Sequence, residues 1–205
     1  MRDGSSVGVE LGPCIVLYED VFDASIFLKS LVQECDDEDG FLNWTRDKVG
    51  DGEVDGRRTS MSCSVNSLRD AAEYSETLKD NTKLLIDEWM NLFPKIDDVV
   101  WSYRKSYELK LAGDQGYHVL RYQHGQEYQA HHDHGPGNGR VLSLVCFLND
   151  GYTGGELVFP TFDVTVTPKA GSVVAFPANF PYQHIAKPVG SDDETVKYSL
   201  VTWFE

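Results

Sequence analysis

The sequence predicts a mainly β protein of the α+β class, in which N-terminal helices buttress a sandwich or jelly roll. Two segments of the first hundred residues repeat apolar side chains at helical spacing. From Tyr117 onward the chain changes to short β-rich runs separated by turn residues. Many short strands at this spacing are typical of a sandwich or jelly roll. Without a repeat or a linker we expect one domain over 1–205, with a helical buttress in 1–105 and a jelly-roll core in 106–205.

Composition and charge limit the classes of partner. A content of 41% hydrophobic and 12% aromatic residues in 205 residues is ordinary for a folded domain. No apolar run approaches the roughly 20 residues that span a bilayer, and the first residues lack the apolar core of a signal peptide. The formal charge of −15 disfavours nucleic acid, whereas a basic or neutral peptide would be tolerated. We therefore expect a cytoplasmic protein without a membrane or nucleic-acid partner.

Two helices are expected in the N-terminal half. Asp23 can cap the first, and the acidic run 36–40 ends it. Its apolar stripe consists of Leu28, Leu31, Val32 and Cys35. The second spans about 68–93, and Pro94 should stop it because proline lacks the N–H that a helix interior needs. Its wider apolar face consists of Leu78, Leu85, Ile86, Trp89, Met90, Leu92 and Phe93.

A polar segment separates the two helices. Residues 45–63 are rich in glycine, charge and hydroxyl side chains, so we expect a mobile loop or a hairpin. Long loops beside a rigid scaffold often act as lids over a site. On composition alone, a surface loop without function is an equally good interpretation.

The C-terminal half reads as strands. Turn residues such as Gly137-Asn138-Gly139 and Asn149-Asp150-Gly151 punctuate the β-rich runs. The expected strands lie near 117–122, 141–148, 155–159, 163–167, 172–176, 183–187 and 196–204.

The segment His131-His132-Asp133-His134 offers more metal ligands than one ion needs. Residues two apart share a face of a strand, so His131 can act with Asp133, or His132 with His134. Spacing cannot choose between the pairs, although only the first contains a carboxylate, which suits Fe(II) beside nitrogen ligands. A surface turn is the bland alternative, because Gly135-Pro136-Gly137 follows at once.

Two residues further along complete the candidate site. His184 follows an apolar strand and its turn, which places it near a strand end. Two imidazoles and one carboxylate are the ligand set of non-haem Fe(II) oxygenases, and they leave other metal positions open. Lys197 shares a strand face with Ser199, Val201 and Trp203. An ammonium group that points inward needs a charge partner, and a bound carboxylate would be one.

Residues 117–204 resemble the catalytic core of the Fe(II)/2-oxoglutarate-dependent dioxygenases, in the prolyl 4-hydroxylase-like branch. In the N-terminal half only Arg58-Thr59-Ser60 resembles the family, at its substrate-loop signature. The matching stretches are RYQHGQEYQAHHD (121–133), RVLSLVCFLND (140–150), GGELVFP (154–160), PKAGS (168–172), His184 with Pro188-Val189, and KYSLVTW (197–203). The resemblance implies a double-stranded β-helix, which is a jelly-roll variant.

The resemblance also implies roles for individual residues. His131, Asp133 and His184 would be the catalytic iron ligands, which favours the first of the two pairings. Lys197 would bind the distal carboxylate of 2-oxoglutarate, with Tyr122 and Ser143 hydrogen-bonding nearby. Phe147 departs from a tyrosine that some relatives have at a cosubstrate-facing position. The residues expected to face or reach the substrate are Tyr128, Arg140, Trp203, Arg58 and Ser60.

The implied reaction couples oxidative decarboxylation of 2-oxoglutarate to succinate with hydroxylation of a C–H bond. Its cofactors and cosubstrates would be Fe(II), 2-oxoglutarate and O2, with ascorbate as a reductant. A proline in a peptide or protein is the favoured substrate, and closure of 45–63 would protect the reaction from water. The alternatives are hydroxylation of a free amino acid or another small molecule, and a non-catalytic metal-binding jelly roll.

Overall fold

The computed structural model describes residues 7–46, 56–71, 78–190 and 196–205. Within these residues the strands form two antiparallel sheets. The larger sheet has the order β1-β2-β10-β7-β12-β5-β4-β3 and the smaller has the order β6-β11-β8-β9. The larger sheet contains β1 (Val9–Gly12), β2 (Ile15–Tyr18), β3 (Thr45–Arg46), β4 (Met61–Ser64), β5 (Asp114–Tyr122), β7 (Leu142–Phe147), β10 (Val173–Pro177) and β12 (Lys197–Phe204). The smaller contains β6 (Tyr128–His131), β8 (Leu157–Phe159), β9 (Val164–Val166) and β11 (His184–Ala186).

The central strands of the larger sheet are buried on both faces, which explains their nearly continuous apolar sequences. On β10, Val173 and Ala175 belong to the core under the helices. Their neighbours Val174 and Phe176 belong to a second core shared with the smaller sheet. Because successive side chains of a strand point to opposite faces, one sheet supports both cores. The mainly β fold with flanking helices is confirmed.

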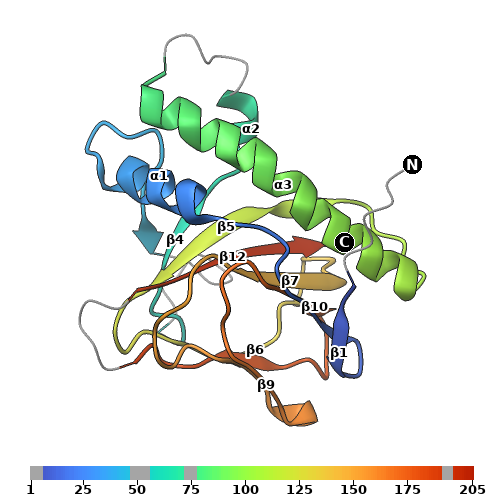
Figure 1. Ribbon diagram of the computed structural model, residues 1–205. Helices are drawn as coiled ribbons and strands as arrows, with labels where there is room; N and C mark the ends of the chain where they lie inside the picture. Colours follow the sequence, from blue (N-terminus) through green and yellow to red (C-terminus); the bar gives the residue numbers. More distant parts are fainter. Residues whose placement is uncertain (1–6, 47–55, 72–77, 191–195) are drawn as a thin grey trace.

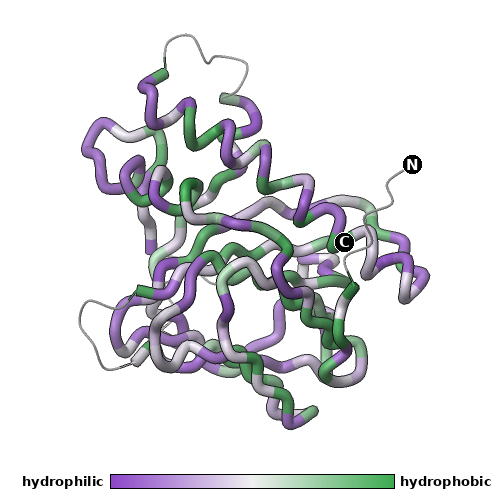
Figure 2. The backbone as a smooth tube through the Cα atoms, viewed as in Figure 1, coloured by the Kyte–Doolittle hydropathy of each residue, from purple (hydrophilic) through white to green (hydrophobic). Residues whose placement is uncertain are grey.

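Helices cover the outer face of the larger sheet (Figure 1). They are α1 (Ser25–Asp36), the short α2 (Ser67–Ala71) and the long α3 (Asp80–Ser106). Along α3 hydrophobic residues alternate with hydrophilic ones, as expected for a helix with one buried face (Figure 2). None of these described helices is both long and apolar enough to cross a membrane.

The expected first helix is close to the observed α1. Asp23 lies just before it, and its carboxylate accepts a hydrogen bond from the Ser25 backbone N–H at 2.9 Å. Cys35 and Leu31 are buried, whereas Leu28 and Val32 are only partly so. Glu34 is also buried, because its carboxylate accepts hydrogen bonds from Asn81 and Thr82 at the start of α3.

The expected end of the second helix is wrong. Pro94 lies inside α3, which continues to Ser106. Pro94 and Met90 both lie on the exposed face of α3. Because Pro94 has no N–H, the Met90 carbonyl lacks its usual hydrogen bond within the helix. A solvent-facing carbonyl can bond to water, so the cost of the proline is reduced at this position. Beyond it, Ile96, Val99 and Tyr103 are buried and hold the helix on the sheet. Met90 is 49% exposed and does not belong to the buried stripe, contrary to expectation.

All seven expected strands are present, but the N-terminal half contributes strands as well as helices. Four short strands, β1 to β4, extend both edges of the larger sheet. β3 and β4 pair as an antiparallel hairpin, with Thr45 opposite Ser62. The connecting residues 47–55, which belong to the expected lid over 45–63, lie outside the described residues.

Candidate active site

The smaller sheet brings two histidines together. His131 ends β6 and His184 begins β11, and the antiparallel register places them directly opposite each other. Opposite residues of a strand pair point to the same face, so the imidazole rings lie side by side with centroids 4.1 Å apart. Asp133 follows two residues after the end of β6.

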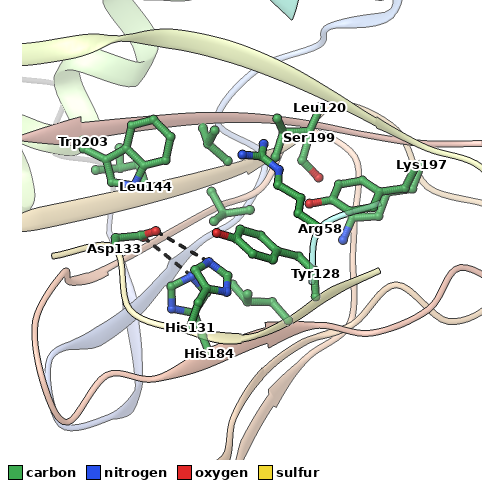
Figure 3. Close-up of a pocket in the computed structure, with 15 residues that line it drawn as sticks. Arg58, Leu120, Tyr128, His131, Asp133, Leu144, His184, Lys197, Ser199 and Trp203 are labelled. Carbon is green, nitrogen blue, oxygen red and sulfur yellow. Dashed lines mark ion pairs between the residues drawn. The ribbon is translucent and has the colours of Figure 1, made fainter. Parts of the chain in front are cut away.

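These three side chains converge on one point (Figure 3). The two Asp133 carboxylate oxygens lie 3.6 Å from His131 Nε2 and 3.6 Å from His184 Nε2 respectively. One ligand atom from each residue falls within 4.8 Å of the others. Separations of this size allow a single ion to contact all three, because metal–nitrogen and metal–oxygen bonds are about 2 Å long.

Backbone carbonyls fix the orientation of both imidazoles. His131 Nδ1 lies 2.8 Å from the Gln129 carbonyl oxygen, and His184 Nδ1 lies 3.1 Å from that of Tyr182. A carbonyl only accepts hydrogen bonds, so each Nδ1 carries the proton. The Nε2 lone pairs are therefore free to face Asp133 and a metal ion, as in protein metal sites where the second ring nitrogen is anchored.

The electrostatics of the cluster favour a neutral imidazole beside an ionised carboxylate. Burial, together with the neighbouring His184, lowers the pKa of His131 to about 3. Burial alone would raise the pKa of Asp133, but His184 and His131 outweigh it and hold this pKa below its ordinary value. These are the protonation states that metal coordination requires.

The alternative pair of histidines does not converge. The His132 and Phe180 rings have centroids 6.3 Å apart. His134 Nδ1 lies 3.0 Å from the Arg140 carbonyl oxygen. Among the described residues, His131, Asp133 and His184 form the cluster with metal-binding spacing. The geometry therefore favours the first of the two pairings.

Lys197 lies on the larger sheet with only 2% of its surface exposed. Its ammonium donates a hydrogen bond to the Gly155 carbonyl at 2.6 Å and lies 5.1 Å from the Tyr122 ring centre. In the described part of the chain, no carboxylate forms an ion pair with it. Burial lowers its pKa to about 8, against a smaller opposing effect of Glu156. A buried ammonium in this setting would gain from an anionic ligand.

One pocket is lined both by the cluster and by Lys197. The labelled side chains of Figure 3 show Lys197 and Ser199 at one end and Asp133 at the other. Its walls include Leu120, Leu157 and Val201, so most of the space between the two ends is apolar. The Ser199 hydroxyl is buried without a hydrogen-bond partner among the described residues. It is a polar group that sequence reasoning placed on the Lys197 face without assigning it a role.

The structure separates the two residues expected beside Lys197. Tyr122 lines the pocket and lies opposite Lys197 in the β5–β12 pairing. Ser143 lies opposite Trp203, six residues along β12 from Lys197. The nearby Ser143 side chain contributes to the lowered pKa of Asp133. Ser143 therefore lies toward the metal-ligand end of the site, whereas Ser199 is the serine that lines the pocket near Lys197.

Three of the residues expected to face a substrate gather over His131. The Tyr128 ring stacks on the His131 ring with centroids 3.5 Å apart. Arg58 pairs with Tyr128 through an isolated β-bridge, and its guanidinium lies 5.1 Å above the Tyr128 ring centre. Ser60 is buried and accepts a hydrogen bond from Arg58 Nε at 3.2 Å. Ser60 therefore positions Arg58 and does not itself line the pocket.

Arg140 and Trp203 lie beside Asp133. The Arg140 guanidinium carbon is 3.7 Å from the centre of the Trp203 ring system. Its Nη1 donates a hydrogen bond to the Asp133 backbone carbonyl at 3.3 Å. Trp203 lines the pocket directly. Cationic and aromatic groups thus surround the metal-ligand end, in a chain whose net charge is −15.

Comparison with known proteins finds one family model that matches the C-terminal part of the chain. Residues 117–205 match the model of the 2OG-Fe(II) oxygenase superfamily, named for 2-oxoglutarate and iron. A search of curated proteins finds no match.

Three solved structures share the fold. A viral collagen prolyl hydroxylase from Paramecium bursaria Chlorella virus-1, in a 2-oxoglutarate complex, is 16% identical, with a TM-score of 0.58 and coverage of 94% of this chain and 96% of that chain. A Pseudomonas putida prolyl-4-hydroxylase is 20% identical, with a TM-score of 0.63 and coverage of 94% and 92%. A Trichoplax adhaerens prolyl hydroxylase, in complex with a fragment of hypoxia inducible factor, is 15% identical, with a TM-score of 0.65 and coverage of 93% and 83%. At these identities the likeness establishes a common double-stranded β-helix fold.

The residues present fit both groups in the family's name. Two Nε2 lone pairs and one carboxylate suit Fe(II), and the buried Lys197 ammonium with the unpaired Ser199 hydroxyl suits a carboxylate of 2-oxoglutarate. These groups line one pocket. All of these residues lie within 117–205, the part of the chain that matches the model of the 2OG-Fe(II) oxygenase superfamily.

Proposed function

We propose that the chain is a 2-oxoglutarate-dependent dioxygenase that hydroxylates a proline within a peptide or protein. His131, Asp133 and His184 hold Fe(II), and Lys197 holds the distal carboxylate of 2-oxoglutarate. The observation that carries the proposal is the pairing, in one pocket, of a convergent three-ligand cluster with a buried lysine that lacks a carboxylate partner in the described chain.

Each part of the site has a separate task. Bound Fe(II) and 2-oxoglutarate supply the oxidising power to insert one atom of O2 into a C–H bond, and 2-oxoglutarate leaves as succinate and CO2. The Gln129 and Tyr182 carbonyls hold the two imidazoles so that both Nε2 atoms face the ion. The three protein ligands occupy one side, so the remaining positions stay available.

At the other end Lys197 orients the cosubstrate. Its ammonium is fixed by the Gly155 carbonyl, which restricts the direction from which a carboxylate can pair with it. Ser199 and Tyr122 add polar groups to the same end of the pocket. Between the ends, Leu120, Leu144 and Val201 exclude water, which strengthens the charge interactions inside.

The residues around the pocket mouth support a peptide substrate. Arg58 above Tyr128 and Arg140 above Trp203 offer guanidinium donors beside aromatic faces. Guanidinium groups bind carbonyl oxygens, and aromatic rings pack against a proline ring. Two of the structurally similar proteins are named as a collagen prolyl hydroxylase and a prolyl hydroxylase bound to a peptide fragment. These features favour peptidyl proline over a free amino acid.

The test is succinate formation from 2-oxoglutarate by protein loaded anaerobically with Fe(II) and then exposed to O2, with ascorbate present. A panel of proline-rich peptides and free amino acids is included, and products are identified by a mass gain of one oxygen atom. We expect turnover that a proline peptide stimulates and that His131→Ala abolishes.

Each other outcome has a clear meaning. Stimulation by a free amino acid in place of any peptide would replace the proposed substrate class and retain the oxygenase. Stoichiometric Fe(II) binding without turnover in any mixture would favour a binding module, and failure to bind Fe(II) would overturn the proposal.

A further inference from the structure

The Arg140 guanidinium is held on three sides. Nε donates a hydrogen bond to the Gln115 side-chain oxygen at 2.8 Å, and Nη1 donates to the Asp133 carbonyl at 3.3 Å. The Trp203 ring system covers one face at 3.7 Å. In the described part of the chain Nη2 has no hydrogen-bond partner. These contacts therefore fix the Nε edge of the Arg140 guanidinium, and the opposite edge presents N–H donors.

Strand alternation alone would not bring Gln115 to this position. On β5, Leu120 and Tyr122 line the pocket, whereas Tyr117 and Val119 face the helices. By simple alternation Gln115 would also face the helices. The β5–β12 register changes this, because Tyr117 pairs with Thr202 while Asp114 pairs with Phe204. β5 thus holds one residue more than β12 over this stretch, and the bulge turns Gln115 toward the pocket side.

The sequence builds this bulge at Gly116. Its φ of +88° is in the left-handed region, which favours glycine. An added Cβ would lie 2.4 Å from the Asn66 side-chain nitrogen. Asp114 accepts a hydrogen bond from the Gly116 N–H, and Asn66 accepts one from the Tyr117 N–H. The bulge is therefore held by its own side-chain contacts, apart from any contact with Arg140.

Glu205 fixes which end of the Gln115 amide faces Arg140. The Gln115 Nε2 group donates a hydrogen bond to a Glu205 carboxylate oxygen at 3.3 Å. The amide oxygen must then point the other way, toward Arg140 Nε. A chain of contacts runs from Glu205 through Gln115 and Arg140 to the backbone of the candidate ligand Asp133.

We propose that Gln115 is a positioning residue for substrate recognition. It fixes Arg140 so that the outer N–H groups face a carbonyl oxygen of the peptide beside the metal. This inference rests on the proposed function, since it deepens the substrate role of Arg140. It adds a residue that lies outside the pocket lining and outside every motif noted in the sequence.

The first test compares Gln115→Met with the wild type in the succinate assay. Methionine keeps the side-chain length and removes the acceptor. We expect KM for the peptide to rise roughly tenfold, as for loss of a hydrogen bond to a charged group, with kcat and the Kd for 2-oxoglutarate within about twofold. The double variant Gln115→Glu with Glu205→Gln exchanges donor and acceptor roles and should restore KM. Gln33→Met, an exposed glutamine on α1, is the matched control.

The second test needs no substrate. The Arg140 Nε–H signal in ¹⁵N spectra, assigned by its loss in Arg140→Lys, reports the bond to Gln115 directly. We expect its exchange with water to accelerate at least roughly tenfold in Gln115→Met and to slow again in the double variant. Unchanged exchange would overturn the inference even if KM rises. Accelerated exchange with unchanged KM would show that Gln115 holds Arg140 without serving recognition, and would also overturn it.

The two tests separate failure of this inference from failure of the proposed function. If no peptide is turned over by the wild type, the proposed substrate class is wrong. The Nε–H exchange then still decides whether Gln115 holds Arg140, and the KM comparison is made with the acceptor that does stimulate turnover. An unchanged KM for that acceptor would overturn the inference as well.

Discussion

At the scale of single residues, Lys197 is unusual because its ammonium group is buried. Burial lowers its pKa from an ordinary 10.5 to about 8. A carboxylate beside the ammonium would favour the charged form and raise this pKa again. Binding of 2-oxoglutarate is therefore coupled to the protonation of Lys197 whenever the pH exceeds about 8.

This coupling predicts the pH dependence of cosubstrate affinity. Below about pH 8 Lys197 is protonated in the free and bound protein, so Kd is constant. Above about pH 8, Lys197 must take up a proton before it can pair with the carboxylate, so Kd should rise by about tenfold per pH unit. Titration calorimetry with 2-oxoglutarate between pH 7 and 9.5 measures this slope. Lys197→Arg should flatten it, because a guanidinium remains protonated throughout. A wild-type Kd without a pH slope would contradict the assigned role.

The histidine cluster makes a second prediction at the residue scale. His131→Ala should weaken Fe(II) binding by at least roughly 100-fold, because one of three protein ligands is lost. His132→Ala should change the affinity by less than about twofold, since its ring lies beside Phe180, away from the cluster. Anaerobic equilibrium titration with Fe(II) compares the two. Equal losses in both variants would mean that the binding site uses the other pair.

Sequence reasoning reached the convergent residues of the site through different kinds of signal. The i, i+2 spacing placed His131 and Asp133 on one face, but only the resemblance selected them over His132 and His134. The β6–β11 register that brings His184 opposite His131 is a long-range pairing, which no local pattern encodes. The resemblance also implied that Ser143 lies near Lys197. Its place opposite Trp203 depends on strand register, and a register cannot be read from one strand alone.

At the scale of elements, the apolar strands were predictable and the polar ones were not. β10 and β12 are buried on both faces and so carry apolar runs. β6 has the sequence Tyr-Gln-Ala-His, and two of its residues contribute side chains to the candidate site. Its sequence therefore lacks the alternation of apolar and polar residues by which a strand is predicted. The four-residue strands β1 and β4 are too short to show a period and form because the larger sheet offers them an edge.

The helix α3 shows tertiary packing overriding a local rule. Pro94 lies in its interior, where proline costs about 3 kcal/mol relative to alanine in an isolated helix. Because Pro94 is exposed, Pro94→Ala should recover part of this cost without loss of packing. We expect the free energy of unfolding to rise by about 1–2 kcal/mol in denaturant titrations, since the unfolded chain also gains freedom. Lower stability of Pro94→Ala would mean that the proline is needed to fit α3 onto the sheet.

At the scale of the whole molecule, the candidate site joins the two sheets. His131 and His184 belong to the smaller sheet, whereas Lys197 belongs to the larger one. The core between the sheets is apolar near Phe147 and Phe176 and becomes polar toward the pocket. Fe(II) and 2-oxoglutarate, bound together, would therefore connect the sheets where the apolar core does not.

This placement predicts how ligands change the stability of the fold. A ligand at 100 times its Kd adds about 2.7 kcal/mol to the free energy of unfolding. For a chain of this size that is a rise in Tm of roughly 5–10 °C. We expect 2-oxoglutarate to raise Tm mainly when Fe(II) is present, because only then is 2-oxoglutarate held at both sheets. Anaerobic thermal unfolding with each ligand alone and with both measures the coupling.

Two variants assign that coupling to the two ends of the pocket. Lys197→Ala should keep the rise in Tm caused by Fe(II) and lose the increment from 2-oxoglutarate, because truncating one partner of a buried charge pair costs about 2–5 kcal/mol of binding. His131→Ala should lose both rises, since the metal is then no longer held. Strictly additive rises in the wild type would show that the two ligands bind independently. The site would then not connect the two sheets as its position in the fold predicts.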